Sequence, residues 1–187
     1  MSAAPAPQFI VRDGIEDDIP ACLALDSRYE THQVLQVYLH GQESTGWEVS
    51  LQRERLPRPV ELSNSFQRIQ LRSALDQKHC LLVAEQHSDE QIVGGLVMTP
   101  NEMHGFAQIQ NIVVSASARR KKAGSRLLIA SGIWAREHGL TRLMAELQTK
   151  NTPAIAFLES LGFSFCGFND RYFSDENIAL FFSLPLK

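Results

Sequence analysis

The sequence predicts a mixed α/β fold in which flanking helices cover a mostly antiparallel central sheet. Two apolar runs, 79–85 and 92–99, are joined by the polar segment QHSDEQ, a pattern typical of an antiparallel hairpin. A β-branched run at 107–114 is followed by an amphipathic stretch over 120–138 and by another strand-like run at 141–147. A strand, a helix and a second strand in this order predict a crossover between parallel neighbours.

The N-terminal half adds a short strand, helices and a second hairpin. Phe9–Arg12 is strand-like, and Asp13–Asp18 offers N-cap chemistry for a helix that we expect to end near Tyr29. Two alternating segments flank the turn sequence GQESTG, and Leu-Pro-Arg-Pro is expected to end the second of them. A short helix is expected around Gln67–Leu75.

The C-terminal part continues the same alternation. Asn151–Ser160 reads as a short helix with Gly162 at its end, and Phe163–Phe168 and Ile178–Leu184 read as strands. Gly94–Gly95, within the earlier hairpin, indicates a bulge or close packing. The whole pattern predicts six or seven strands.

Composition places the chain among ordinary globular proteins. With 187 residues, 44% of them hydrophobic and 21% charged, we expect one domain over 9–187 after a flexible tail at 1–8. A net charge of −3 argues against nucleic-acid binding by bulk electrostatics. No apolar run approaches the ~18 residues of a membrane span.

The three cysteines and the N-terminus bear on metal binding and location. Cys22, Cys80 and Cys166 are widely spaced without a CxxC motif, so they are interpreted as reduced core residues and not as a metal site or a disulfide framework. The sequence MSAAPAPQ lacks the basic start and apolar core of a signal peptide. These features predict a cytoplasmic protein without membrane contact.

A basic turn between the 107–114 strand and the 120–138 helix is the strongest functional signal. The first N–H groups of a helix lack intrahelical partners and carry partial positive charge, so such a turn favours a phosphate. A solvated helix start without any ligand is the alternative. Four adjacent cations precede the small residues that open the helix: Arg119, Arg120, Lys121 and Lys122, followed by Ala123, Gly124 and Ser125.

The turn resembles the acetyl-CoA signature of the GNAT superfamily of N-acetyltransferases, Arg/Gln-x-x-Gly-x-Gly/Ala. Arg119 and Gly124 match that pattern, with the Leu127–Leu128 pair three residues further on, whereas Lys122 stands where the first glycine usually does. The resemblance implies a mixed sheet of the acyl-CoA N-acyltransferase fold and acetyl-CoA as cosubstrate. It implies cofactor contacts from Ile112, Val113, Val114, Arg119, Arg120, Lys121, Lys122, Ala123, Gly124, Ser125 and Asn151.

A second stretch resembles the other signature of the superfamily, Asn-x-x-Ala-x-x-x-Tyr-x-x-x-Gly-Phe. Asn151, Ala154, Gly162 and Phe163 match it in register, and Leu158 occupies the tyrosine position. In the family that tyrosine usually protonates the departing CoA thiolate, which leucine cannot do. The nearest resemblances are to ribosomal-protein alanine acetyltransferases and streptothricin acetyltransferases.

Two residues are the catalytic candidates. By resemblance to the alanine acetyltransferases, Glu146 is the general base that takes the amine proton. Tyr172, in NDRYF, is a candidate acid in place of the missing tyrosine. The alternatives are a structural or solvated Glu146 and a tyrosine that is merely part of the surface or core.

The resemblance implies transfer of an acetyl group from acetyl-CoA to a primary amine by direct attack in a ternary complex. A small molecule, for example an antibiotic-like amine, is the favoured acceptor, and a protein N-terminus is an alternative. A catalytically silent acyl-CoA-binding module is a further alternative, and RNA binding through the basic turn is disfavoured because no aromatic platform accompanies it. A homodimer is compatible with this function, and no metal is expected.

Overall fold

The computed structural model describes residues 8–42 and 46–187. The predicted tail lies outside the described residues except for Gln8, as do residues 43–45 of the expected GQESTG turn. The chain forms two compact units. The first contains Met1–Arg28, Ser63–Ala145 and Ser183–Lys187, and the second contains Tyr29–Leu62 and Glu146–Phe182.

The first unit holds the helices and strands that surround the basic turn. Its elements are β1 (Phe9–Asp13), a 3-10 turn (Glu16–Asp18), α1 (Ile19–Leu23), α2 (Arg68–Asp76), β4 (Cys80–Gln86), β5 (Ile92–Asn101), a 3-10 turn (Glu102–His104), β6 (Phe106–Val114), a 3-10 turn (Ala116–Ala118), α3 (Ala123–Glu137) and the first part of β7 (Arg142–Gln148).

The second unit holds a long hairpin and the C-terminal strands. Its elements are β2 (Tyr29–Gln42), β3 (Gly46–Leu62), the end of β7, α4 (Thr152–Ser160), β8 (Ser164–Asn169) and most of β9 (Ala179–Pro185). The hairpin strands pair antiparallel as their own two-stranded sheet.

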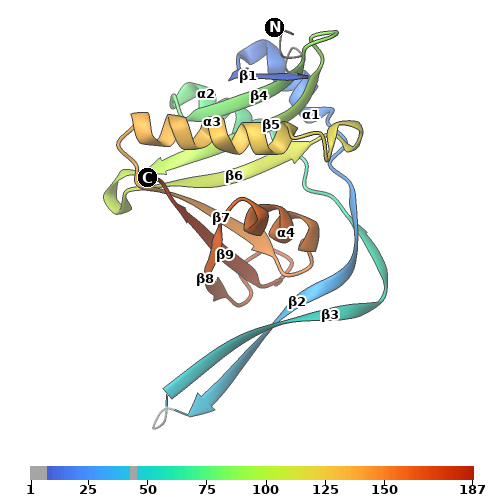
Figure 1. Ribbon diagram of the computed structural model, residues 1–187, viewed down its shortest axis with the longest axis vertical. Helices are drawn as coiled ribbons and strands as arrows, with labels where there is room; N and C mark the ends of the chain where they lie inside the picture. The colour runs from blue at the N-terminus through green and yellow to red at the C-terminus, as the bar shows by residue number, and fades with distance from the viewer. Residues whose placement is uncertain (1–7, 43–45) are drawn as a thin grey trace, which may run out of the picture. The chain divides into compact units, whose positions relative to one another are not determined.

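The main sheet has the strand order β1-β4-β5-β6-β7-β9-β8 (Figure 1). The pairs β1–β4, β4–β5 and β5–β6 are antiparallel, whereas β6 and β7 are parallel. Helix α3 lies between these parallel strands in the chain, so the predicted crossover is confirmed. The β6–β7 pairing runs from Phe106↔Arg142 to Ile109↔Ala145, and the last five residues of β6 lie beyond it.

Two adjacent glycines allow close packing on both faces of β5. A Cβ at Gly94 would lie 3.0 Å from the Val113 carbonyl oxygen and 3.3 Å from Leu127 of α3. A Cβ at Gly95 would lie 3.1 Å from the Phe66 ring, which belongs to the core beneath α1 and α2. The expected close packing is therefore confirmed, and each glycine lets a different layer approach the sheet.

The helix that follows β1 is shorter than predicted. It ends at Leu23, and Asp26–Arg28 has no regular structure before β2 begins at Tyr29. The reason is tertiary, because the Arg119 guanidinium donates hydrogen bonds to the carbonyl oxygens of Asp26 and Arg28. A helical segment would turn those carbonyls toward its own N–H groups.

Strand β3 continues through both prolines, so the prediction that Leu-Pro-Arg-Pro ends it is wrong. The pairing with β2 shifts between Thr31 and Gln33, and residues 56–59 of β3 have no paired partner in this register. Proline has no N–H group to give to a ladder, so an irregularity is where a strand tolerates it. The strand then resumes pairing at Val60↔Thr31.

Candidate functional site

The basic turn leaves the N-terminus of α3 open. The first hydrogen bond of the helix runs from the Arg126 N–H group to the Lys122 carbonyl oxygen at 3.0 Å, and no side chain caps the helix. The N–H groups of Ala123, Gly124 and Ser125 come before this first hydrogen bond, so no carbonyl of the helix accepts from them. Together with the helix dipole they form a site suited to a phosphate.

The turn has an unusual backbone, which the sequence did not predict. Arg120 has φ +64° and Lys122 has φ +72°, so both non-glycine residues adopt the left-handed conformation. Helix α3 begins at Ala123 for this reason, three residues later than predicted. A left-handed residue followed by a helical one directs successive N–H groups into an anion-binding concavity. The family pattern was the available signal, because its glycine at this position implies positive φ.

The Arg119 side chain forms hydrogen bonds within the protein. Its guanidinium donates to the carbonyl oxygens of Val114 (2.9 Å), Arg28 (2.6 Å) and Asp26 (3.0 Å). Arg119 therefore ties the basic turn to the end of β6 and to the segment after α1. By contrast, Arg120, Lys121 and Lys122 are exposed.

The strand that leads into the turn contains a bulge. The β5–β6 register shifts between Val97 and Met98, which leaves Gln110 as the extra residue of β6. Gln110 is exposed and donates to the Thr99 hydroxyl at 2.9 Å. Bulges re-aim the residues that follow them. Ile112, Val113 and Val114 come after the bulge and pair with the glycine segment of β5.

Asn111 fixes this part of β6 from inside the first unit. The side chain is buried, accepts a hydrogen bond from the Asn64 amide at 2.9 Å, and donates to the Ser65 carbonyl at 3.3 Å. The segment after the hairpin is thereby held against the strand. The sequence alone does not indicate this role, because nothing in the local sequence pairs residue 111 with residues 64 and 65.

The two predicted catalytic residues lie together in the second unit. The Tyr172 hydroxyl donates to the Glu146 carboxylate at 2.8 Å. This hydrogen bond, and then partial burial, raise the pKa of Tyr172 above its ordinary value. The hydroxyl therefore stays protonated at neutral pH and remains a donor to Glu146.

Aromatic and polar contacts set the position of Tyr172. Its ring lies edge-on to Phe173 and Phe181, with centroid distances of 5.2 and 5.6 Å. The Tyr172 N–H donates to the Asn177 carbonyl, and Asn177 in turn donates to the Asp175 carboxylate at 2.6 Å. The loop between β8 and β9 is therefore folded around the tyrosine.

The second signature forms a capped helix. Asn151 is buried, and its side-chain oxygen accepts a hydrogen bond from the Ala154 N–H, so Asn151 is the N-cap of α4. The Thr152 hydroxyl lies 2.8 Å from the Thr31 hydroxyl of β2. Leu158 is 2% exposed and is part of the core. The capping explains the asparagine in structural terms, and its predicted contact with the cofactor stays a prediction.

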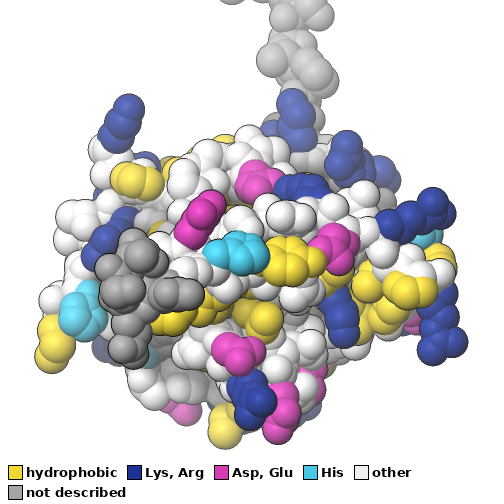
Figure 2. Space-filling view, turned by 90° about the horizontal axis from the view of Figure 1, so that it is seen from below, with side chains coloured by type: hydrophobic (Ala, Val, Ile, Leu, Met, Phe, Trp, Pro, Cys, Tyr) yellow, Lys and Arg dark blue, Asp and Glu magenta, His cyan; other side chains and the backbone are white. Residues whose placement is uncertain are grey.

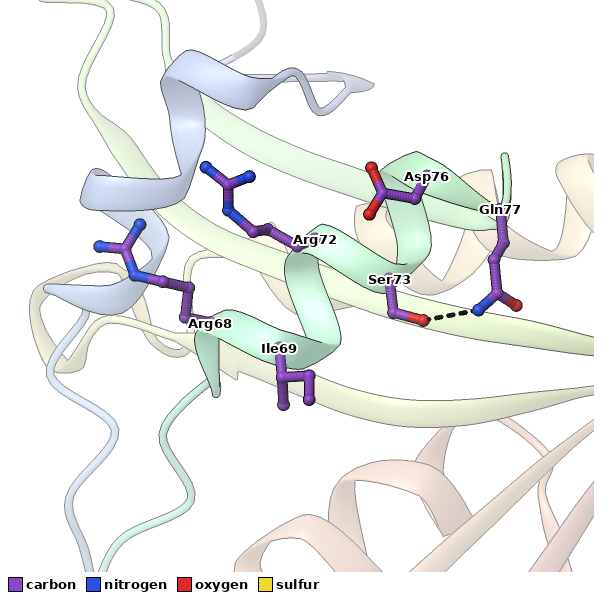
Figure 3. Close-up of a pocket in the computed structure, with 6 residues that line it drawn as sticks. All are labelled: Arg68, Ile69, Arg72, Ser73, Asp76 and Gln77. Atoms are coloured by element: carbon purple, nitrogen blue, oxygen red, sulfur yellow. Dashed lines mark hydrogen bonds between the residues drawn. The ribbon is translucent and has the colours of Figure 1, made fainter.

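Two hollows are formed by described residues that do not include the predicted site residues. A shallow one of about 490 Å³ lies along α2 (Figure 3), where the Gln77 amide donates to the Ser73 hydroxyl at 2.9 Å and Arg72 pairs with Glu16 at 2.5 Å. A smaller one of about 180 Å³ is lined by Ala21, Ala24, Leu25, Gln91, Ile92, Val93, Ser115 and Ser117.

Within residues 8–42 and 46–187, no group of three or more His, Cys, Asp or Glu side chains is placed to hold a metal ion. Over the same residues, no helix is long and apolar enough to cross a membrane. On the face shown in Figure 2, basic, acidic and apolar side chains are interspersed.

A mixed sheet in which the parallel neighbours β6 and β7 are joined by a helix with an open N-terminus defines the acyl-CoA N-acyltransferase class of fold. The model of the Acetyltransferase (GNAT) family matches residues 46–163. The chain belongs to this family.

Relatives and solved structures agree with this assignment. The streptothricin acetyltransferase of Streptomyces lavendulae is 28% identical over 102 residues, which are 52% of this chain and 54% of the relative. The chain thus spans about half the length of that curated relative.

Three solved structures share the fold over nearly the whole chain. Nourseothricin acetyltransferase superposes with a TM-score of 0.81 and 23% identity, covering 96% of this chain and 99% of that one. A streptothricin acetyltransferase from Bacillus anthracis, solved with acetyl coenzyme A, superposes with a TM-score of 0.78 and 22% identity, again covering 96% of this chain and 99% of that one. The ribosomal-protein-S18-alanine N-acetyltransferase of Escherichia coli superposes with a TM-score of 0.65 and 18% identity, covering 96% of this chain and 94% of that one.

Proposed function

We propose that this chain transfers the acetyl group of acetyl-CoA to a primary amine of a small, antibiotic-like molecule. The observation that carries the proposal is the open N-terminus of α3 behind a turn with two left-handed residues. Membership of the GNAT acetyltransferase family supports the reaction class. The similarity to the streptothricin and nourseothricin acetyltransferases supports a small-molecule acceptor.

The residues of the basic turn fit the pyrophosphate of CoA. The N–H groups of Ala123, Gly124 and Ser125 would hold phosphate oxygens, and Arg120, Lys121 and Lys122 would supply positive charge around them. Arg119 would contribute by fixing the turn, because three protein carbonyls already accept its hydrogen bonds. When bound, acetyl-CoA supplies the acetyl group as a thioester.

Glu146 is the proposed general base, acting directly or through water on the amine. An amine must lose a proton to become acylated, and a carboxylate can accept it. Tyr172 holds Glu146 by its hydroxyl hydrogen bond, and Tyr172 is also the proposed proton donor toward the departing thiolate. Because Leu158 is buried and apolar, it cannot take that second role.

The proposal extends to a homodimer in a reducing compartment such as the cytoplasm. Cys22 and Cys80 are buried thiols, and burial raises their pKa to about 11 and about 12 respectively. Unpaired thiols of this kind are usual in reducing compartments. Cys166 is exposed, so the expectation that it is a core residue is wrong.

A panel of amine acceptors tests the proposal. The protein is incubated with acetyl-CoA and with streptothricin-class amines, simple diamines or peptides with free N-termini, and released thiol is measured. We expect release with the small amines. Release with the peptides alone would assign a protein N-terminal acetyltransferase. Calorimetric CoA binding without turnover of any acceptor would assign a silent acyl-CoA-binding module.

A further inference from the structure

The strand that carries the proposed base holds the loop of the proposed acid at two points. Glu146 and Gln148 are two residues apart in β7, so their side chains lie on the same side of the strand. The Glu146 carboxylate accepts the hydrogen bond of the Tyr172 hydroxyl at 2.8 Å. The Gln148 amide donates to the Asp175 carboxylate at 3.4 Å. Tyr172 and Asp175 both belong to residues 170–178, the loop between β8 and β9.

Asp175 also closes this loop from within. Its carboxylate accepts hydrogen bonds from the Asn177 side-chain amide at 2.6 Å and from the Asn177 N–H at 3.3 Å. The Asn177 carbonyl oxygen in turn accepts from the N–H groups of Tyr172 at 3.2 Å and Phe173 at 3.3 Å. The hydrogen bond from the Asn177 side chain lowers the pKa of Asp175 below its ordinary value. The carboxylate is therefore ionised at neutral pH and accepts charge-assisted hydrogen bonds, which are stronger than neutral ones.

The backbone of the loop depends on these contacts. Arg171 and Glu176 have φ +51° and +59°, so both non-glycine residues adopt the left-handed conformation. Such residues cost free energy and persist where the surrounding contacts fix them. The Glu176 N–H donates to the Phe173 carbonyl at 2.8 Å, which closes the turn that contains Asp175.

The ring contacts of Tyr172 leave its height along β7 to the hydrogen bonds. Of the two rings that lie edge-on to Tyr172, Phe173 belongs to the same loop and moves with it, whereas Phe181 belongs to β9. The loop is fixed along β7 by its hydrogen bonds to Glu146 and Gln148. The second of these bonds ends on Asp175.

We propose that Asp175 is a positioning residue for the acetyl transfer, because it closes the 170–178 loop and anchors it to β7 so that the Tyr172 hydroxyl is held on the Glu146 carboxylate. This role rests on the proposed function of Glu146 and Tyr172. Asp175 acts through Tyr172, so removing Asp175 matters for the reaction only while the tyrosine hydroxyl is present.

A double-substitution cycle tests that chain of contacts. Asp175→Ala removes the acceptor of all three hydrogen bonds and is expected to lower kcat with a small amine severalfold, by no more than Tyr172→Phe does. In the Tyr172→Phe background, Asp175→Ala is expected to change kcat by less than about twofold, since the loss has already occurred. Equal losses from Asp175→Ala in both backgrounds would overturn the proposal.

Asp170→Ala is the matched control for this cycle. Asp170 is an exposed aspartate of the same loop and takes no part in the hydrogen bonds above. The substitution removes the same charge from the same loop and is expected to leave kcat unchanged. A loss from Asp170→Ala as large as that from Asp175→Ala would show an effect of loop charge and would overturn the positioning role.

Absorbance titration of Tyr172 tests the contact without relying on turnover. The spectrum of each variant, minus that of the same variant carrying Tyr172→Phe, isolates this tyrosine. The hydrogen bond to Glu146 raises the pKa of Tyr172, and in Asp175→Ala this pKa is expected to fall toward its ordinary value of about 10. Asp170→Ala is expected to titrate like wild type. An Asp175→Ala titration equal to that of Asp170→Ala would overturn the proposal.

A second variant, which changes no charge, keeps the titration decisive. Asn177→Ala removes the donor of the 2.6 Å hydrogen bond to Asp175 and is expected to lower the pKa of Tyr172 as Asp175→Ala does. If wild type acetylates no acceptor, the proposed function is wrong, and the Tyr172 titration still decides whether Asp175 holds the hydroxyl. If wild type is active and neither variant shifts the titration, the positioning role is wrong and the proposed function stands.

Discussion

The Tyr172 hydroxyl donates a hydrogen bond of 2.8 Å to the carboxylate of Glu146, which is 26 residues earlier in the chain. Glu146 is in β7, whereas Tyr172 is in the loop between β8 and β9. One contact therefore joins the proposed base to the proposed acid. Their separate contributions can be distinguished by two substitutions that each remove one function.

Glu146→Gln is expected to lower kcat/KM by about two orders of magnitude, since general-base assistance is typically worth about 10²–10⁴-fold. Glutamine retains an oxygen that accepts the Tyr172 hydrogen bond but cannot take a proton. CoA affinity, measured by calorimetry, is expected to be unchanged. If the variant kept full activity and the same rise of rate with pH on the acidic side of its pH–rate profile, Glu146 would be a structural residue.

Tyr172→Phe is expected to cost less activity than Glu146→Gln. The ring contacts with Phe173 and Phe181 remain, and a thiolate of pKa about 8.5 is a tolerable leaving group. The comparison uses the same amine and the same pH range for both variants. A larger loss for Tyr172→Phe would assign the main proton transfer to the tyrosine.

The raised pKa of Tyr172 has a consequence for stability at alkaline pH. The pKa of Tyr172 is higher in the folded state than in the unfolded state, where it is about 10. The hydroxyl therefore contributes its full stabilisation of the folded state below pH 10, and this contribution is lost as the pH rises through the folded-state pKa. The absorbance titration of wild type minus that of Tyr172→Phe is expected to show one tyrosine ionising above pH 10. Ionisation at or below the ordinary value would contradict the hydrogen bond.

The sequence was informative where local pattern decides structure. Two apolar runs and a polar turn predict the 79–99 hairpin, which the structure contains as β4 and β5. The short helix expected around Gln67–Leu75 is present as α2. The family resemblance brought Glu146 and Asn151 to attention because their motif has fixed spacing. These are features that a short window of sequence contains.

The sequence was uninformative where distant segments decide structure. The first helix ends before Tyr29 because the Arg119 guanidinium donates hydrogen bonds to the carbonyl oxygens of the segment after it. Arg119 is 91 residues beyond Arg28 in the chain, so no local pattern shows this contact. The continuation of β3 through its prolines depends on a register shift opposite Thr31. The hydrogen bond between Tyr172 and Glu146 likewise requires the fold, since each residue was a candidate on separate grounds.

Arg119→Lys is expected to lower the free energy of unfolding by about 2 kcal/mol, because a compact ammonium cannot reach the three carbonyls of the guanidinium. Arg120→Lys, at an exposed neighbour, is the control and is expected to change it by less than about 0.5 kcal/mol. Chemical denaturation measures both. Equal stability of the two variants would indicate that Arg119 serves a ligand and not the turn.

Gly124→Val is expected to weaken CoA binding at least tenfold, a free-energy change of about 1.4 kcal/mol, because the backbone must approach the pyrophosphate there. Ala130→Val, in the same helix, controls for the lower helix propensity of a β-branched residue. Calorimetry with CoA gives both affinities. Unchanged affinity in Gly124→Val would place the pyrophosphate elsewhere.

Lys122→Gly is expected to raise the free energy of unfolding by roughly 1 kcal/mol. Lys122 has φ +72°, and a non-glycine residue in this conformation costs about 1–3 kcal/mol, whereas glycine adopts it freely. Part of the gain is offset, since glycine also makes the unfolded chain more flexible. Lys121→Gly is the matched control. Lys121 does not have a positive φ, so glycine at this position relieves no backbone strain. Glycine still increases the conformational entropy of the unfolded chain, and Lys121→Gly is therefore expected to lower the free energy of unfolding by about 0.5–1 kcal/mol. If the denaturation midpoints of the two variants shifted in the same direction, Lys122 would not be strained in this turn.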